Sequence, residues 1–82
     1  MELEKEINWL LDVLNGTEVL DSSAREVFEL AVAYCKDALH FLKKGDRWNA
    51  LEAYSIAWAY VDALLHLKKV KVPEDCLAKF TV

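Results

Sequence analysis

Apolar residues recur every three or four positions through most of this chain, which is the spacing of one face of an α-helix. Two long runs of this kind meet at the dipeptide Gly45-Asp46. The first run consists of Val27, Phe28, Ala31, Tyr34, Cys35, Ala38, Leu39 and Leu42. The second consists of Ala50, Tyr54, Ala57, Val61, Leu64 and Leu65. The pattern therefore predicts two helices joined by a short turn, at about residues 22–44 and 46–68.

The turn residues themselves favour an antiparallel hairpin. Gly45 can adopt the left-handed conformation that ends a helix. Asp46 can accept hydrogen bonds from the free N–H groups at the start of the next helix. Because the connection is so short, the two helices must lie antiparallel and in contact.

A shorter amphipathic segment precedes the hairpin and predicts a first helix over about residues 2–15. Its apolar residues are Leu3, Ile7, Leu10, Leu11 and Leu14. Asn15-Gly16 has the composition of a helix end. In the connection that follows, Val19 and Leu20 are expected to tuck under the bundle. Asp21, Ser22 and Ser23 compete as the cap of the second helix, and Ser23 with Glu26 has the spacing of a capping box.

The chain after the hairpin is predicted to leave in extended conformation, because Pro73 disfavours helix in the residue before it. Residues 74–79 have room for one further helical turn, with Phe80 and Val82 as anchors, and the placement of residues 70–82 stays open. The expected fold is all-α, a three-helix up-down-up bundle with a short tail, in a single domain over residues 1–82.

The chain contains more apolar side chains than a small helical bundle usually buries. Hydrophobic residues make up 55% of the 82 residues against 29% charged, and they include three Trp, three Tyr and three Phe. Three thin helices usually hide less than this, and so short a chain builds only a modest core. We therefore expect the protein to self-associate.

Charge and cysteine content narrow the function classes. The formal charge of −4 argues against a general nucleic-acid binder, which needs a basic face. No apolar run approaches the ~20 residues of a membrane span, and the acidic first six residues differ from a signal peptide. Two cysteines do not make a disulfide framework. We expect a cytoplasmic protein with reduced thiols and no membrane partner.

The predicted helix lengths are unequal, which points to an interface. The first helix should span about 20 Å and the hairpin helices about 33 Å each. We expect the first helix to cover the hairpin end that holds residues 24–35 and 61–65. The uncovered tip half contains the predicted interface residues, Phe41, Trp48, Leu51 and Tyr54.

The sequence therefore predicts a structural or protein-interaction module. The simplest form is a homodimer that packs the two tip halves into a four-helix arrangement. The alternative is an adaptor that holds a helix of another protein in the same groove.

Two carboxylate–imidazole pairs are candidates for a metal-binding site. Asp37 with His40, and Asp62 with His66, have the spacing that helical bundles use for metal sites. The hairpin separates the pairs by roughly 13 Å, so one subunit cannot join them at one ion. An antiparallel dimer could, which keeps a metal or small-molecule site as a further alternative. We favour a structural role in which Asp37 and Asp62 accept hydrogen bonds from Tyr or Trp.

Other catalytic arrangements find no support in the sequence. Cys35 falls within the apolar stripe, so a buried and inert thiol is expected. Gly16 and Gly45 both fall at helix ends, which leaves no glycine-rich phosphate loop. We predict no enzymatic activity, no cofactor and no bound metal.

Two resemblances involve the hairpin. Residues 41–46, followed by Ala50-Leu51-Glu52, Tyr54 and Ala57, resemble the loop and second helix of a tetratricopeptide unit. A second copy and the closing proline are missing, so we interpret this as shared hairpin geometry.

The second resemblance covers about half the chain. The span from Tyr34 through Gly45, Asp46, Ala50, Ala57 and Tyr60 to Asp62-Ala63 resembles the archaeal family called domain of unknown function 357. The resemblance implies a compact helical archaeal protein, and it offers no catalytic residues to carry over.

Overall fold

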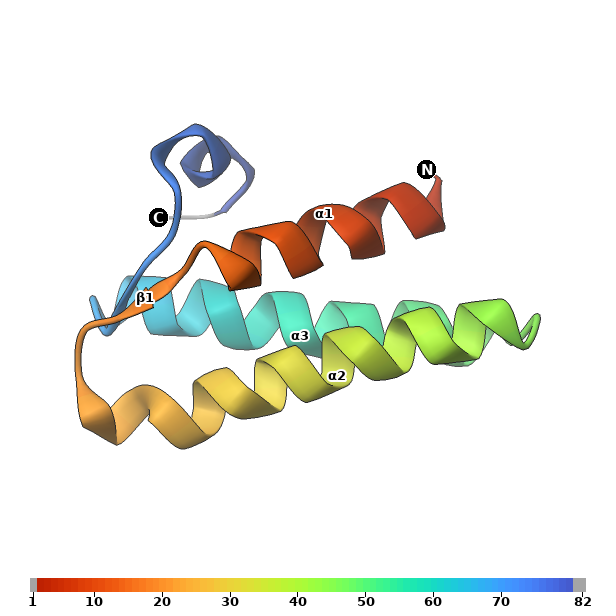
Figure 1. The fold of residues 1–82 in the computed structure, drawn as a ribbon, viewed down its shortest axis with the longest axis horizontal. Helices are drawn as coiled ribbons and strands as arrows, with labels where there is room; N and C mark the ends of the chain where they lie inside the picture. The colour runs from red at the N-terminus through yellow and green to blue at the C-terminus, as the bar shows by residue number, and fades with distance from the viewer. Residues whose placement is uncertain (1, 81–82) are drawn as a thin grey trace.

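The computed structural model describes residues 2–80 and is built from three α-helices. In chain order the elements are α1 (Leu3–Asn15), β1 (Glu18–Val19), the 3-10 helix η1 (Ser22–Ala24), α2 (Arg25–Lys43), α3 (Arg47–His66), β2 (Val70–Lys71) and the 3-10 helix η2 (Glu74–Lys79). The helices α2 and α3 form a long antiparallel hairpin. The shorter α1 packs along the hairpin and runs parallel to α3 (Figure 1). This confirms the predicted all-α hairpin with a short first helix and a short tail.

The hairpin turns at Gly45 and Asp46, as predicted. Gly45 has φ +80°, and the N–H of Asp46 donates to the carbonyl of Phe41 over 2.9 Å, which is the bond that closes a Schellman motif. Asp46 then caps α3, because its Oδ1 accepts from the N–H of Asn49 over 3.1 Å. A Cβ at position 45 would meet nothing within 4 Å, so glycine is required for its backbone angle alone.

The helix α2 begins at Arg25, three residues later than predicted, after the 3-10 turn η1. Of the three candidate caps, Asp21 caps η1, since its Oδ1 accepts from the N–H of Ser23 over 2.9 Å, whereas α2 follows Ala24 without a side-chain cap, so the expected Ser23–Glu26 capping box is not formed. The side chain of Ala24, the last residue of this turn, is buried in the interior of the molecule.

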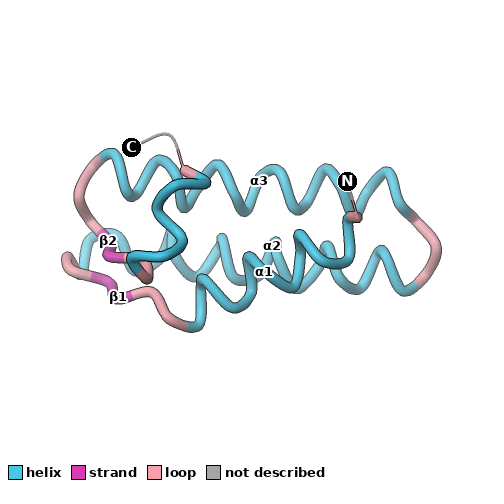
Figure 2. The backbone as a smooth tube through the Cα atoms, turned by 90° about the horizontal axis from the view of Figure 1, so that it is seen from above, coloured by secondary structure: helices cyan, strands magenta, loops and turns pink. Residues whose placement is uncertain are grey.

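A small two-stranded sheet, which the helical pattern did not predict, closes the end of the molecule opposite the turn (Figure 2). The strands β1 and β2 pair antiparallel, with Val19 opposite Val70, and the N–H of Leu20 donates to the carbonyl of Lys69 over 2.8 Å. Val70 is buried with Ala24 and Leu64, and Val19 packs against them. Leu20 is 54% exposed, so the expectation that it tucks under the bundle is wrong.

The first helix covers a different part of the hairpin from the one expected. Its middle lies against the middle of α2, where the Cys35 thiol donates to the Ile7 carbonyl over 3.6 Å. Its first turn reaches the hairpin tip, where Leu3 lines a hollow together with Leu42 and Arg47. The expectation that it covers the far end is therefore wrong. The physical reason is β1, which pairs with β2 and so shifts the end of α1 along the hairpin.

The tail is the remaining part of the core. Phe80 is 6% exposed and packs against Trp9 of α1 and Trp58 of α3, which confirms it as an anchor. The other expected anchor, Val82, lies outside the described residues. Within residues 2–80, no helix has the length and apolar character needed to cross a membrane.

Candidate functional site

One face of the α2–α3 hairpin is covered by α1 and by the tail, and we call it the covered face (Figure 1). Ile7 meets Cys35 of α2 on this side. Phe80 stacks on Trp58 of α3, with ring centroids 5.4 Å apart. The residues that line it are therefore part of the hydrophobic core.

No described helix or strand lies over the opposite side of the hairpin (Figures 1 and 2). Trp58 and Tyr60 are two residues apart, about 200° around the helix, so Tyr60 points away from the covered face. Its ring lies 6.0 Å from that of Tyr34 in α2. On α2, Leu30 precedes Tyr34 by one turn and Phe41 follows it by two turns, and on α3, Ile56 precedes Tyr60 by one turn.

We call these five residues, Leu30, Tyr34, Phe41, Ile56 and Tyr60, the open face. Leu30 is 42% exposed, and the other four are partly exposed. Tyr34, Phe41 and Tyr60 pack in part against the core, and the remaining surface of each ring is exposed. An apolar stripe on a solvent-facing side of a helix pair is unusual, since that side normally carries charged and polar residues.

The four residues predicted as the interface do not form one surface. Phe41 belongs to the open face. Tyr54 lies one turn before Trp58 and packs against the core on the covered face. Trp48 and Leu51 lie on the outer edge of α3. A common role for all four in one interface would require contacts on two sides of the hairpin.

Trp48 and Leu51 form the most exposed apolar feature at the tip. Trp48 is 78% exposed and Leu51 36% exposed. Together with Glu52 and Ser55 they line a shallow hollow of about 240 Å³. Their part in an interface stays a prediction.

Tyr54 and Glu6 make a polar contact between α3 and α1. Burial raises the pKa of Tyr54 to about 12, and the nearby Glu6 carboxylate adds to the rise. The phenol therefore stays protonated at neutral pH and can donate to Glu6. This contact joins α1 to α3 on the covered face.

The two carboxylate–imidazole pairs are differently placed. Asp62 lies 3.9 Å from His66, with its side chain largely buried while His66 is exposed. Asp37 is exposed on α2. No three His, Cys, Asp or Glu side chains gather into a possible metal site anywhere in residues 2–80. The structural roles of Asp37 and Asp62 as acceptors stay predictions.

Cys35 lies in the core, as expected for a structural thiol. It is fully buried, and burial raises its pKa to about 12. A thiol with so high a pKa supplies almost no thiolate at neutral pH, so it is a poor nucleophile.

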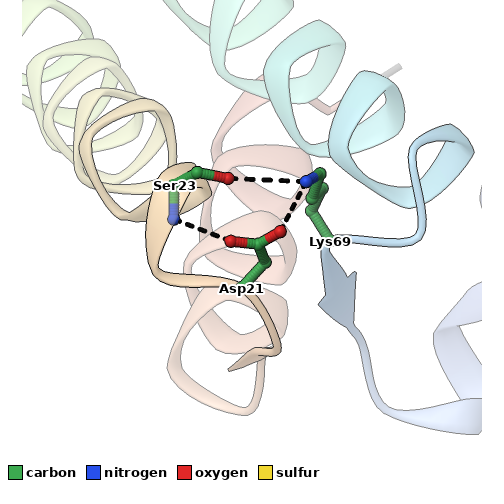
Figure 3. A network of polar contacts seen from close by, with 3 residues as sticks. All are labelled: Asp21, Ser23 and Lys69. Carbon is green, nitrogen blue, oxygen red and sulfur yellow. Dashed lines mark hydrogen bonds and ion pairs between the residues drawn. The ribbon is translucent and has the colours of Figure 1, made fainter.

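A polar network that sequence reasoning missed ties the start of α2 to the exit of α3 (Figure 3). The ammonium of Lys69 pairs with Asp21 and lies 3.4 Å from the Ser23 hydroxyl. The hydrogen bonds from Lys69 and from the Ser23 N–H hold the pKa of Asp21 well below its usual range. Asp21 could be found as a cap, but its partner lies 48 residues away and leaves no local pattern.

These features define a small all-α protein built on an antiparallel helical hairpin, with one apolar face covered and the other open. The family model for Protein of unknown function (DUF357) matches residues 4–70, so the chain belongs to that family. This confirms the resemblance drawn from the hairpin. The match runs from α1 to the first residue of β2, and η2 lies beyond it. No curated protein and no solved structure matches the chain.

Proposed function

We propose that this protein is a non-enzymatic interaction module that forms a homodimer, in which the open face packs against the same face of a second copy. The observation that carries the proposal is the aromatic and aliphatic stripe on the side of the hairpin that α1 leaves uncovered. In a monomer the exposed parts of these side chains would stay in contact with water, which is unfavourable for apolar groups. A second copy would remove them from water.

The size of the open face is sufficient for a specific dimer. A helix of 20 residues is about 30 Å long, and two helices side by side are roughly 20 Å wide. The face could therefore bury about 600 Å² on each partner. The total of ~1,200 Å² lies at the lower end of specific protein interfaces.

Charge along the edge of the open face favours an antiparallel copy of this chain. Glu26 and Lys44 are 18 residues apart, about five turns, and so lie in one column on α2. In an antiparallel pair, Glu26 would face the partner's Lys44 at both ends of the interface. Leu30 would face the partner's Phe41. A parallel pair would not bring these opposite charges together, so it would lack this attraction.

The same arrangement places Ile56 at the centre of the dimer. The midpoint between Glu26 and Lys44 is residue 35. Since the chain turns at Gly45 and Asp46, residue 35 lies level with residue 56 of α3. The two-fold axis would therefore pass beside Ile56, which would meet its equivalent in the second copy.

The first experiment tests whether the open face is the interface. Ile56→Asp would place a charge in the centre of the dimer and should weaken association about a hundredfold. Leu20→Asp is the matched control, because Leu20 is an exposed leucine at the far end of the molecule and should leave association unchanged. The measurement is the molar mass by analytical ultracentrifugation, with circular dichroism to verify folding. Wild-type protein that remains monomeric at high micromolar concentration would overturn the proposal.

A second experiment tests the orientation. In a Cys76→Ser background, Ile56→Cys should form a disulfide-linked dimer on mild oxidation, and Leu20→Cys should not. Association without the Ile56→Cys cross-link would reject the antiparallel arrangement and leave dimerisation itself standing.

A further inference from the structure

The C-terminal segment, residues 74–80, is held to the body of the protein by one aromatic slot. The ring of Phe80 lies between Trp9 of α1, at 5.8 Å, and Trp58 of α3, at 5.4 Å. Phe80 is the buried residue of this segment, whereas its neighbours are exposed or partly exposed. The side chain of one residue therefore carries most of the apolar attachment.

The residue before Phe80 makes the polar attachment. The Lys79 ammonium lies 3.6 Å from the Glu6 carboxylate and 4.4 Å from the centre of the Trp9 ring. A cation over an indole ring and beside a carboxylate is favoured by both. The slot formed by Glu6, Trp9 and Trp58 thus accommodates a cation followed directly by an aromatic ring.

The backbone of the segment contributes little to this attachment. The N–H of Cys76 donates to the carbonyl of Pro73 and that of Phe80 to the carbonyl of Leu77, so neither bond reaches α1 or α3. The segment also lies beyond the part of the chain that matches the family, residues 4–70, whereas Glu6, Trp9 and Trp58 all lie inside it.

We infer that the slot is a docking site for a segment of another protein in which Lys or Arg directly precedes an aromatic residue, and that Lys79-Phe80 occupies it as an internal competitor. The chemistry of the partner follows from that of the present occupant. Its aromatic ring would pack between the two indoles, and its cation would pair with Glu6. A tethered occupant competes at an effective concentration of about millimolar, so it sets a threshold that a partner must exceed. The slot lies on the covered face, away from the open face, so docking does not depend on dimerisation.

The test uses the full chain and a fluorescent peptide with the sequence of residues 73–80 as the probe. Phe80→Ala should empty the slot and bind the probe about tenfold or more tightly than wild type, measured by fluorescence anisotropy. Leu77→Ala is the matched control, because Leu77 is an exposed residue of the same segment and its loss should leave the wild-type affinity unchanged. A probe with Ala in place of Phe80, and another with Glu in place of Lys79, should each bind more weakly.

Two outcomes would overturn the inference. One is a folded Phe80→Ala protein, verified by circular dichroism, that does not bind the probe more tightly than wild type. The other is equal binding of the probe that lacks the aromatic ring. If Phe80→Ala does not fold, Lys79→Glu in the full chain provides the test, because it loosens the segment and leaves the ring in place. It should raise the affinity for the probe, and an unchanged affinity would overturn the inference.

Discussion

The two faces of the α2–α3 hairpin are made of similar residues and have different surroundings. The covered face carries Tyr54 and Trp58, and the open face carries Tyr34 and Tyr60. What separates them is α1 and the tail, which lie on one side of the hairpin (Figure 1). The difference shows that residue type alone does not distinguish a core face from an interface face in a small helical protein. The position of the third helix distinguishes them.

The largest effect is expected when an isoleucine that contacts each face is shortened. Ile7 of α1 is fully buried against the covered face, and Ile56 is partly exposed on the open face. Ile7→Ala should lower the free energy of unfolding by about 3 kcal/mol, because it leaves a cavity in the core. Ile56→Ala should lower it by less than about 1 kcal/mol at protein concentrations where the chain is monomeric. The measurement is urea unfolding, and equal losses at the two positions would contradict the distinction between the faces.

A smaller loss is expected at the tail. Phe80→Ala should lower the free energy of unfolding by about 2 kcal/mol, which is the transfer free energy of one buried ring. The loss should fall below that of Ile7→Ala, because Phe80 is 6% exposed whereas Ile7 is fully buried. Leu77→Ala should stay within about 0.5 kcal/mol of wild type. If Phe80→Ala is also near neutral, the tail does not belong to the covered face.

The sequence was sufficient where the determinants are local. The hairpin follows from helical spacing together with Gly45 and Asp46, whose capping contacts the structure contains. The burial of Cys35 follows from its place in the apolar stripe. Each of these features depends on residues within a few turns of one another.

The same reasoning failed where distant segments determine the result. The strands β1 and β2 are two residues each, too short for an alternating pattern, and they pair residues 18–19 with residues 70–71. Because this pairing shifts α1 along the hairpin, the covered region could not be placed from helix lengths. The faces of α3 could not be told apart either, since that helix is apolar almost all round.

The two ends of the hairpin use one helix-ending motif with different residues, which gives the next prediction. Gly45 after α2 and Lys68 after α3 both have positive φ, +80° and +58°. The left-handed conformation costs a residue with a side chain about 1 kcal/mol. Gly45→Ala should therefore destabilise the protein by about 1 kcal/mol, and Lys68→Gly should stabilise it by up to about 1 kcal/mol. Thermal unfolding checks both, and a Lys68→Gly protein less stable than wild type would refute the shared motif.

The smallest effect is expected at the Asp21–Lys69 contact, which lies at the end of the molecule where β1 meets β2. Lys69 and the Ser23 N–H lower the pKa of Asp21 in the folded protein below the value of about 3.9 in an unfolded chain. Between these two values the unfolded state binds more protons, so the stabilisation is present above about pH 4 and is lost as the pH falls. Asp21→Asn should therefore lose less stability than wild type between about pH 5 and pH 2.

Lys69→Met should reduce the same pH dependence, because Lys69 is the main cause of the lowered pKa. The contact is exposed to solvent, so ~1 M salt should also weaken it in wild type and have little effect in Asp21→Asn. Denaturant unfolding at a series of pH values measures all three proteins. If both variants keep the full acid sensitivity of wild type, the Asp21–Lys69 pair does not stabilise the end of the molecule where β1 meets β2.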